Sequence, residues 1–268
     1  MRIAAPSETE HFLRLDTIDS TNAEALRRTR AGEHGPLWIV AERQSAGRGR
    51  RGRSWVSPPG NLHATLLVID PAPAALAPQL GFVAGLALHD AASAAAPALA
   101  PRFALKWPND LLCGGRKIAG ILVEGEGDPV AAAIGFGVNC REHPADAEYP
   151  ATDFAADGAD VPATALFDLL AAAMTERLYQ WRRGAGFAAA RAAWLERAAG
   201  RGNPIRVRLP DRETTGIFET IDESGRLLLR HATGTLEAIA AGEVFPIDGI
   251  SGHTAGAGLP ADDTGRRV

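Results

Sequence analysis

The segment Gly47–Arg53 contains four arginines interleaved with three glycines. Glycine allows backbone N–H groups to approach a ligand closely, and arginine adds a permanent positive charge with a planar set of donors. Together these properties suit the binding of phosphate groups, although a solvated, flexible charged loop would have the same composition. The chain has a formal net charge of −4, so the basic cluster is local, and we do not expect a protein that coats nucleic acid.

The same loop matches the dinucleotide fingerprint Gly-x-Gly-x-x-Gly over Gly47–Gly52. That fingerprint has physical meaning only where the loop opens a helix within a βαβ unit. Here residues 37–41 and 62–69 predict strands on both sides, and Pro58-Pro59 prevents a helix directly after the loop. We therefore expect an antiparallel connection and reject the Rossmann interpretation. A P-loop is excluded as well, because no Gly-x-x-x-x-Gly-Lys-Ser/Thr sequence occurs.

A second candidate position is Lys106, on a segment that alternates apolar and polar side chains over residues 102–107. The alternation predicts a strand that ends at Pro108-Asn109-Asp110. Lys106 would be the one lysine on this strand, with apolar residues on either side of it in the sequence. An exposed strand lysine would fit the same pattern.

The strands expected next carry an unusual number of glycines. Residues 111–124 predict a hairpin around Gly114-Gly115, with Gly120 in the middle of its return strand. Residues 131–140 predict a further strand that contains Gly135 and Gly137. Strand glycines often mark the close approach of a ligand or another backbone, so we expect a flat, apolar slot above these strands.

Polar residues also gather at Ser20-Thr21-Asn22. Thr21 is followed three residues later by Glu24, which predicts a capping box at the start of a helix. These residues fit a cap alone or a ligand site, and the two roles are compatible because a helix N-terminus also offers free N–H groups to an anion.

The remaining elements predict one large domain and one small one. Helices are expected over residues 76–96, 162–183 and 187–199, and Gly200–Pro204 gives the domain boundary. Short strands over residues 205–240 then predict a small β-barrel. We predict a catalytic domain over residues 1–200, a barrel domain over 203–249 and a disordered tail over 250–268.

Composition points to an ordinary globular protein. Of 268 residues, 46% are hydrophobic and 22% charged, and no apolar segment is long enough to span a membrane. The N-terminus lacks the apolar core of a signal peptide. Cys113 and Cys140 form no paired metal motif. We therefore expect a protein of the reducing cytoplasm without a membrane partner.

Four segments taken together resemble the biotin–protein ligases. They are Ser20-Thr21-Asn22, Gln44–Trp55, Lys106-Trp107-Pro108-Asn109-Asp110 and Lys117–Glu124. Their order and spacing match over about residues 12–247, and the arginine-glycine loop with the Lys-Trp-Pro-Asn-Asp motif is highly specific. The resemblance implies an α+β fold: a class II aminoacyl-tRNA synthetase-like mixed sheet flanked by helices, followed by a small SH3-like β-barrel.

The resemblance also implies the reaction. Biotin and ATP, with Mg²⁺ expected beside the ATP, would give biotinyl-5′-AMP and pyrophosphate. A lysine of a biotin carboxyl carrier protein, such as that of acetyl-CoA carboxylase, would then take the biotinyl group. Because carboxylate and triphosphate repel each other, such a site must concentrate positive charge.

The resemblance assigns roles to particular residues. Arg50 and Lys106 would be catalytic, Arg50 through a lid that closes over the adenylate and Lys106 between the biotin carboxyl and the α-phosphate. The residues implied for biotin are Ser20, Thr21, Asn22, Gln44, Arg48, Gly49, Arg50, Lys106 and Gly120. Those implied for ATP or the adenylate are Arg48, Arg50, Arg51, Trp55, Lys106, Asn109, Lys117 and Asn139. Gly120, Gly135 and Gly137 would leave room for the biotin ring and adenine.

Some points stay open at this level. Trp55 would stack on adenine or anchor the core, and Lys117 would reach the ligand or be a solvated hairpin residue. About a dozen residues precede the first strand, so we do not expect the N-terminal DNA-binding domain of many family members, or DNA as a partner. A lipoate–protein ligase and a non-enzymatic biotin-binding regulator are the alternative functions. The sequence identifies no metal ligands, and it leaves both a monomer and a homodimer open.

Overall fold

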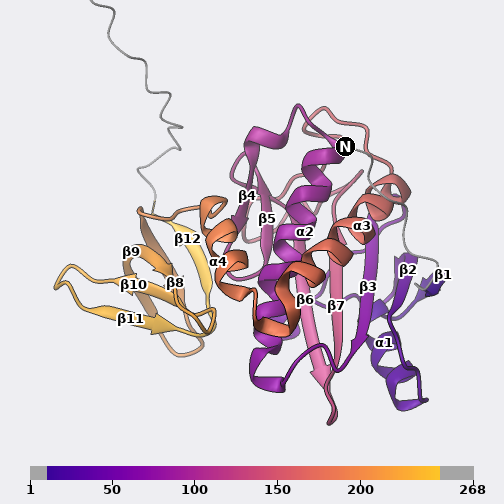
Figure 1. Ribbon diagram of the computed structural model, residues 1–268. Helices are drawn as coiled ribbons and strands as arrows, with labels where there is room; N and C mark the ends of the chain where they lie inside the picture. The colour runs from indigo at the N-terminus through magenta and orange to yellow at the C-terminus, as the bar shows by residue number, and fades with distance from the viewer. Residues whose placement is uncertain (1–10, 248–268) are drawn as a thin grey trace, which may run out of the picture.

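The structure is a computed structural model, and it describes residues 11–247. The predicted tail over 250–268 lies outside the described residues. Two sheets organise the chain (Figure 1). No helix among the described residues is long and apolar enough to cross a membrane.

The larger sheet has seven strands in the order β1-β2-β3-β7-β6-β5-β4. Its strands are β1 (His11–Ile18), β2 (Leu37–Gln44), β3 (Leu62–Ile69), β4 (Phe103–Lys106), β5 (Asp110–Cys113), β6 (Arg116–Glu126) and β7 (Ala131–Val138). Strands β1 and β2 run parallel, whereas every other neighbouring pair is antiparallel. The antiparallel pairing of β2 with β3 confirms that the arginine-glycine loop does not belong to a Rossmann unit.

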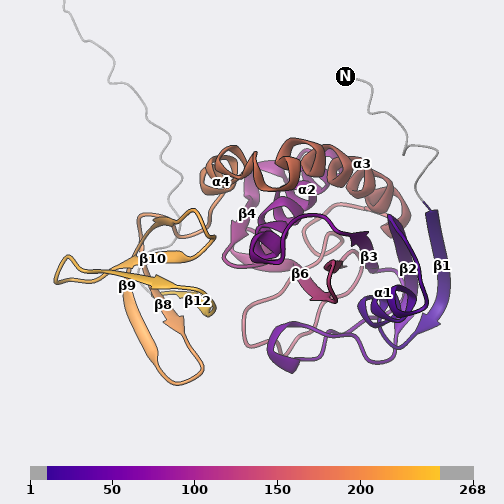
Figure 2. The ribbon, with the colours of Figure 1, turned by 60° about the horizontal axis from the view of Figure 1, so that its bottom comes forward.

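The two faces of this sheet carry different helices (Figure 2). Helix α1 (Thr21–Arg30) packs on one face against β2, β3 and β7. Helices α2 (Leu80–Ala95), α3 (Ala163–Trp181) and α4 (Phe187–Glu196) cover the other. The main core lies on the α2/α3 face, because aromatic and branched side chains of the strands point that way.

The predicted helix over residues 76–96 is divided in two. A 3₁₀-helix, η2 (Ala74–Gln79), comes first and contains Pro78, and α2 begins only at Leu80. Proline lacks the N–H that an α-helix needs in its interior, so Pro78 belongs to the short preceding turn. The other 3₁₀ segments are η1 (Arg50–Gly52), η3 (Ala100–Arg102) and η4 (Arg182–Gly184).

The smaller sheet is antiparallel, with five strands in the order β11-β10-β9-β8-β12. They are β8 (Pro204–Arg208), β9 (Glu213–Ile221), β10 (Leu227–Arg230), β11 (Leu236–Ile239) and β12 (Glu243–Pro246). The strands predicted over residues 205–240 correspond to β8–β11, but the sequence did not predict β12, which pairs with β8 at the edge of the sheet. The sheet stands beside the β4 edge of the larger one, where the Trp107 indole donates a 3.2 Å hydrogen bond to the Gly225 carbonyl. A separate antiparallel C-terminal sheet after an α+β domain confirms the predicted fold class.

Candidate functional site

A cavity of about 880 Å³, part of it open to solvent, lies on the α1 face of the large sheet. The β2–β3 loop covers it, and Gly242 and Glu243 of the small sheet reach its rim. All but one of the residues implied by the sequence line it, namely Ser20, Thr21, Asn22, Gln44, Arg48, Gly49, Arg50, Arg51, Trp55, Lys106, Asn109, Lys117 and Gly120. Four segments that are distant in sequence therefore meet at one place.

The cavity is strongly positive. Its lining holds four arginines and two lysines against two carboxylates, Asp110 and Glu243. The whole chain has the opposite net charge of −4, so the positive charge is concentrated here. An anionic ligand fits this imbalance.

Lys106 and Lys117 share one carboxylate at the bottom of the cavity. The Lys106 ammonium lies 2.8 Å from Asp110 Oδ2, and the Lys117 ammonium lies 2.7 Å from Asp110 Oδ1. Burial alone would raise the pKa of Asp110, but the two ammonium groups outweigh it and lower that pKa to about 2. Lys106 is therefore buried and ion-paired. The alternative interpretation of Lys106 as an exposed strand lysine is wrong.

The chain contains only two lysines, and both contact Asp110. All 26 other basic side chains (Lys and Arg) are arginines. Lysine is a compact point charge on a flexible stem, whereas arginine is a larger planar group. In a chain so rich in arginine, both lysines occur where two cations must fit around one buried carboxylate.

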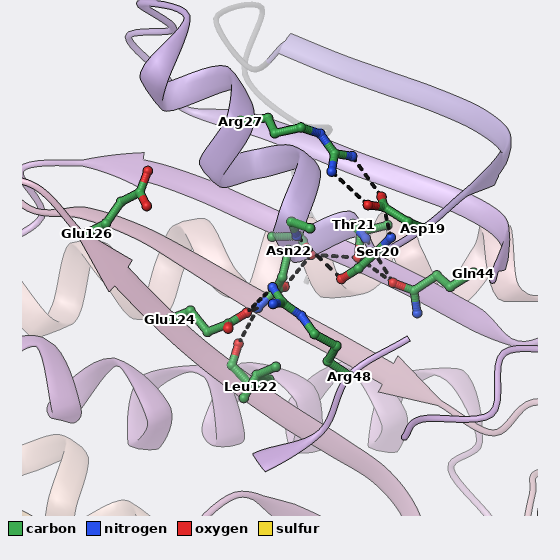
Figure 3. A network of polar contacts seen from close by, with 12 residues as sticks. Asp19, Ser20, Thr21, Asn22, Arg27, Gln44, Arg48, Leu122, Glu124 and Glu126 are labelled. Carbon is green, nitrogen blue, oxygen red and sulfur yellow. Dashed lines mark hydrogen bonds and ion pairs between the residues drawn. The ribbon is translucent and has the colours of Figure 1, made fainter. Parts of the chain in front are cut away.

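The polar residues at the start of α1 form one connected network (Figure 3). The N-cap is Ser20, whose hydroxyl accepts from Ala23 N, so the predicted capping box centred on Thr21 is wrong by one residue. Thr21 N and Oγ1 both lie within 3.1 Å of Gln44 Oε1. The Asn22 amide donates to the Leu122 carbonyl and to Glu124 Oε2. Figure 3 shows Asn22 and Arg48 converging on the same Glu124 carboxylate.

Two strand glycines make room for side chains of this site. A Cβ built on Gly135 would lie 2.2 Å from Asn22 Oδ1, and one on Gly137 would lie 2.4 Å from Trp55 Cε2. Real Cβ atoms do not approach so closely, so both positions require glycine in this arrangement. The slot predicted above these strands is thus occupied by Asn22 and Trp55, and its Asn22 side is polar.

The arginine-glycine loop is ordered by its own backbone. Gly49 N donates to the Arg53 carbonyl at 2.7 Å, and Trp55 N donates to the Gly47 carbonyl at 2.9 Å. Arg51 adopts a left-handed conformation with φ of 57° at the turn. The loop is therefore a short hairpin that projects over the cavity.

The four loop arginines divide into two pairs. Arg48 binds Glu124 at 3.0 Å, and Arg53 binds Glu243 of β12, so the two base arginines are ion-paired. Within residues 11–247, Arg50 and Arg51 at the tip form no ion pair. Burial, followed by the Arg51 charge, lowers the pKa of Arg50, whose contact with Asn109 Oδ1 is long at 3.4 Å. Arg50 is thus a partly buried cation held over the cavity without a carboxylate.

Asn139 is the one implied residue outside this cavity. It lines a neighbouring hollow that shares Trp55 and Lys117 with the cavity and also contains Tyr149. Its side chain is buried and donates to the Thr152 carbonyl at 3.0 Å. In this structure Asn139 therefore holds the segment after β7 in place.

Comparisons with known proteins show which family the chain resembles in sequence. Residues 15–139 match the model of the biotin/lipoate A/B protein ligase family, and residues 202–245 match the biotin protein ligase C terminal domain. A biotin–[acetyl-CoA-carboxylase] ligase of Paracoccus denitrificans is 46% identical over 86% of this chain and 98% of that protein. The chain belongs to the biotin protein ligase family.

Other members of the biotin protein ligase family agree in sequence and in fold. The bifunctional ligase/repressor BirA of Escherichia coli is 32% identical over 86% of this chain and 72% of that protein. A biotin protein ligase from Aquifex aeolicus, in complex with biotin and ATP, superposes with a TM-score of 0.74 at 26% identity. That match covers 88% of this chain and 97% of the Aquifex chain.

Several residues of this ligase site were not singled out from the sequence, among them Asp110, Glu124, Tyr149 and Glu243. Asp110 was assigned only to the end of a strand, although it pairs directly with Lys106 across the β4–β5 turn. The sequence did contain a usable signal for this ion pair, because a lysine and an aspartate stand four residues apart on either side of a Pro-Asn turn. Glu124 and Tyr149 gave none, because their roles depend on the approach of the loop and of the segment after β7.

Proposed function

We propose that this protein activates biotin with ATP and transfers the biotinyl group to a lysine of a biotin carrier protein, such as that of acetyl-CoA carboxylase. The observation that carries the proposal is the Lys106–Asp110–Lys117 cluster beneath the arginine loop. It concentrates positive charge where a carboxylate and a triphosphate must meet. The matched C-terminal domain supports biotin over lipoate, because its family is described as the C terminal domain of biotin protein ligases.

In the activation step the biotin carboxylate attacks the α-phosphate of ATP, and pyrophosphate leaves. We assign Lys106 and Lys117 to the carboxylate and α-phosphate, since both ammonium groups are positioned in advance by Asp110. Arg50 and Arg51 at the loop tip would stabilise the departing charge. Preorganised cations at a site of developing negative charge are a major source of rate enhancement.

The remaining residues would bind the two ends of the adenylate. The biotin end would contact Ser20, Thr21, Asn22, Gln44, Arg48, Gly49 and Gly120. The nucleotide end would contact Trp55, Asn109 and Asn139, with adenine in the hollow that Trp55 separates from the main cavity. Much of the first set is already hydrogen-bonded internally, which fixes its geometry before the ligand arrives.

In the transfer step a neutral amine of the carrier attacks the biotinyl carbonyl. A C–N bond forms, the bond to the phosphate oxygen breaks, and AMP leaves while the amine proton passes to solvent. Arg50, as part of the loop tip, would retain the adenylate and exclude water until the carrier binds. The rest of the rate would come from proximity and electrostatics.

Mg²⁺ would enter with ATP and be held mainly by phosphate oxygens. The described residues contain no cluster suited to a metal, and both carboxylates of the cavity are already paired with cations. We place the reaction in the cytoplasm, where ATP is available and the two buried, free cysteines stay reduced. We also retain the division into residues 1–200 and 203–249 as a proposal.

The test is pyrophosphate–ATP exchange by the purified chain with biotin, with lipoate and with no acid. We expect exchange with biotin only, followed by labelling of a biotin carrier domain at one lysine. Exchange with lipoate alone would favour a lipoate ligase. Tight biotin binding without exchange would favour a non-enzymatic regulator.

A further inference from the structure

The two lysines create a chemical problem for the proposed reaction. An acyl-adenylate reacts with amines, and the two side-chain amines of this chain both lie in the cavity where the adenylate would form. A neutral lysine there would attack the mixed anhydride before the carrier arrived. Nucleophilic attack needs the free electron pair of the neutral amine, which an ammonium ion lacks.

Asp110 contacts both amines through different oxygens. Lys106 Nζ lies 2.8 Å from Oδ2, and Lys117 Nζ lies 2.7 Å from Oδ1. The Asp110 side chain is only 7% exposed, so water screens these contacts little. One buried carboxylate therefore forms an ion pair with both lysines.

An aromatic ring adds to this effect at each lysine. The Lys106 ammonium lies 4.3 Å from the centre of the Tyr149 ring, and the Lys117 ammonium lies 5.5 Å from that of Trp55. Aromatic faces attract cations and not neutral amines. Burial raises the pKa of Tyr149 to about 12, so its ring stays neutral.

The arginines of the cavity act in the opposite direction. Arg50 and Arg51 also line it and form no ion pair within residues 11–247, so their positive charge repels the two ammonium groups. Without Asp110, no carboxylate among the described residues would be ion-paired with either lysine. Glu243, the other carboxylate of the cavity, is bound to Arg53.

We propose that Asp110 is a positioning residue that protects the ligase from its own product, by holding both lysines as ammonium ions. The inference rests on the proposed function, because that function supplies the adenylate. In the unwanted reaction, a neutral Nζ would form an amide with the biotinyl carbonyl, AMP would leave, and one proton would pass to solvent. The carrier lysine belongs to another protein and is not bound to Asp110. It can therefore reach the adenylate as a neutral amine.

The chain is well suited to a test by mass spectrometry. Its acylatable amines are two lysine side chains and the N-terminal amine, and its other basic side chains are arginines. We would add synthetic biotinyl-5′-AMP directly, so that the result does not depend on the activation step. Intact mass and peptide mapping would then give the number and position of the biotinyl groups.

We expect the parent chain to remain unmodified at both lysines. Asp110→Asn should acquire one biotinyl group at Lys106 or Lys117, at a rate about tenfold or more above the parent. Asp110→Glu, which keeps the carboxylate, should restore most of the protection. The additional change Lys106→Arg or Lys117→Arg would identify the acceptor.

A matched control is Asp157→Asn. Asp157 is also buried and bound to two cations, Arg102 and Arg116, but it does not line the cavity. This variant should show no lysine acylation, and labelling of the N-terminal amine should be equal in all variants. If Asp110→Asn lost its fold by circular dichroism, Asp110→Glu and a Tyr149→Leu variant, which removes only the ring, would carry the test. Tyr149→Leu should then acylate at Lys106 faster than the parent.

Two results would overturn the proposal. One is an Asp110→Asn chain that stays folded and unmodified at both lysines, and the other is equal acylation in the parent. Neither would affect the proposed function, which depends on biotin-dependent pyrophosphate exchange by the parent. Loss of that exchange would contradict the proposed function whatever the acylation result.

Discussion

Strand β7 (Ala131–Val138) presents two very different faces. On one face, Phe136 packs 6.0 Å from Trp38, ring centre to ring centre, inside the main core. On the other, Gly135 and Gly137 present no side chain, and Asn22 and Trp55 fill the space above them. Successive residues of one strand therefore serve stability and binding in turn.

The comparison shows how this fold separates its two requirements. The α2/α3 face is filled by side chains of the sheet itself, so its packing does not depend on the site. On the α1 face, the strand glycines leave space above the sheet. Side chains from α1 and from the arginine loop fill that space. A change on the first face should alter stability and leave activity per folded molecule intact, whereas a change on the second should alter activity.

The largest expected effect is on the core face. Phe136→Ala should lower the free energy of unfolding by about 3–5 kcal/mol, because it leaves a cavity beside Trp38. Urea denaturation would measure the loss, and exchange activity per folded molecule should stay close to that of the parent. A loss of activity without a loss of stability would contradict the division between the two faces.

Lys106→Ala should have nearly the opposite result. We expect biotin-dependent exchange to fall by about a hundredfold to a thousandfold, as when one preorganised charge donor is removed from an active site. The fold should persist, because Lys117 still pairs with Asp110. Arg230→Ala, which removes an exposed cation bound to Glu219, is the matched control and should leave exchange unchanged. Normal rates in Lys106→Ala would remove this residue from the reaction.

The sequence predicted most of the strands and helices because their signals were local, whereas the α+β fold class came from the family resemblance. The antiparallel strands around the arginine loop followed from apolar runs and from Pro58-Pro59, and both sheets followed from alternation and turn residues. The missed strand, β12 (Glu243–Pro246), is only four residues long and is defined by pairing with β8. Its formation depends on tertiary contacts, for which a short segment carries no periodic signal.

The site was predicted less completely than the fold. The resemblance brought together the residues that line the cavity, but it did not reveal which of them are bound to one another. Asp110, Glu124 and Glu243 neutralise particular cations, and these pairs depend on sheet register and domain packing. The resemblance assigned Arg48 and Arg50 alike to biotin and to the nucleotide, whereas within residues 11–247 Arg48 is ion-paired and Arg50 is not.

Gly137→Ala tests the site face with a single methyl group. The added Cβ would lie 2.4 Å from Trp55, so the indole must move. We expect exchange to fall by about tenfold and stability to fall by about 1–3 kcal/mol, the usual range for overpacking. Gly81→Ala in α2 is the control, since its Cβ would meet nothing within 4 Å. If both variants behaved like the parent, the close packing of Trp55 on Gly137 would not matter for function.

Arg50→Ala tests the division within the loop. We expect unchanged stability, because Arg50 has no ion pair within residues 11–247, and faster escape of the adenylate by about tenfold. Rapid filtration after a single turnover would measure the retained biotinyl-5′-AMP. Arg53→Ala, which breaks the Glu243 contact at the loop base, should instead loosen the small sheet from the loop. Equal adenylate retention in Arg50→Ala and the parent would count against a sealing role for the loop tip.

The smallest expected effect concerns acid. The pKa of Asp110 is about 2 in the folded chain, against 3.8 for an ordinary aspartate. As the pH falls, Asp110 therefore becomes protonated in the unfolded chain before it does so in the folded chain. The carboxylate therefore contributes stability that is complete above about pH 4 and is lost as the pH falls towards about 2. Asp110→Asn should lower the free energy of unfolding at neutral pH and reduce its dependence on pH within this window. Asp211→Asn, at an exposed position, should keep the slope of the parent. Equal slopes in Asp110→Asn and the parent would mean that Asp110 does not carry the charge on which both lysines depend.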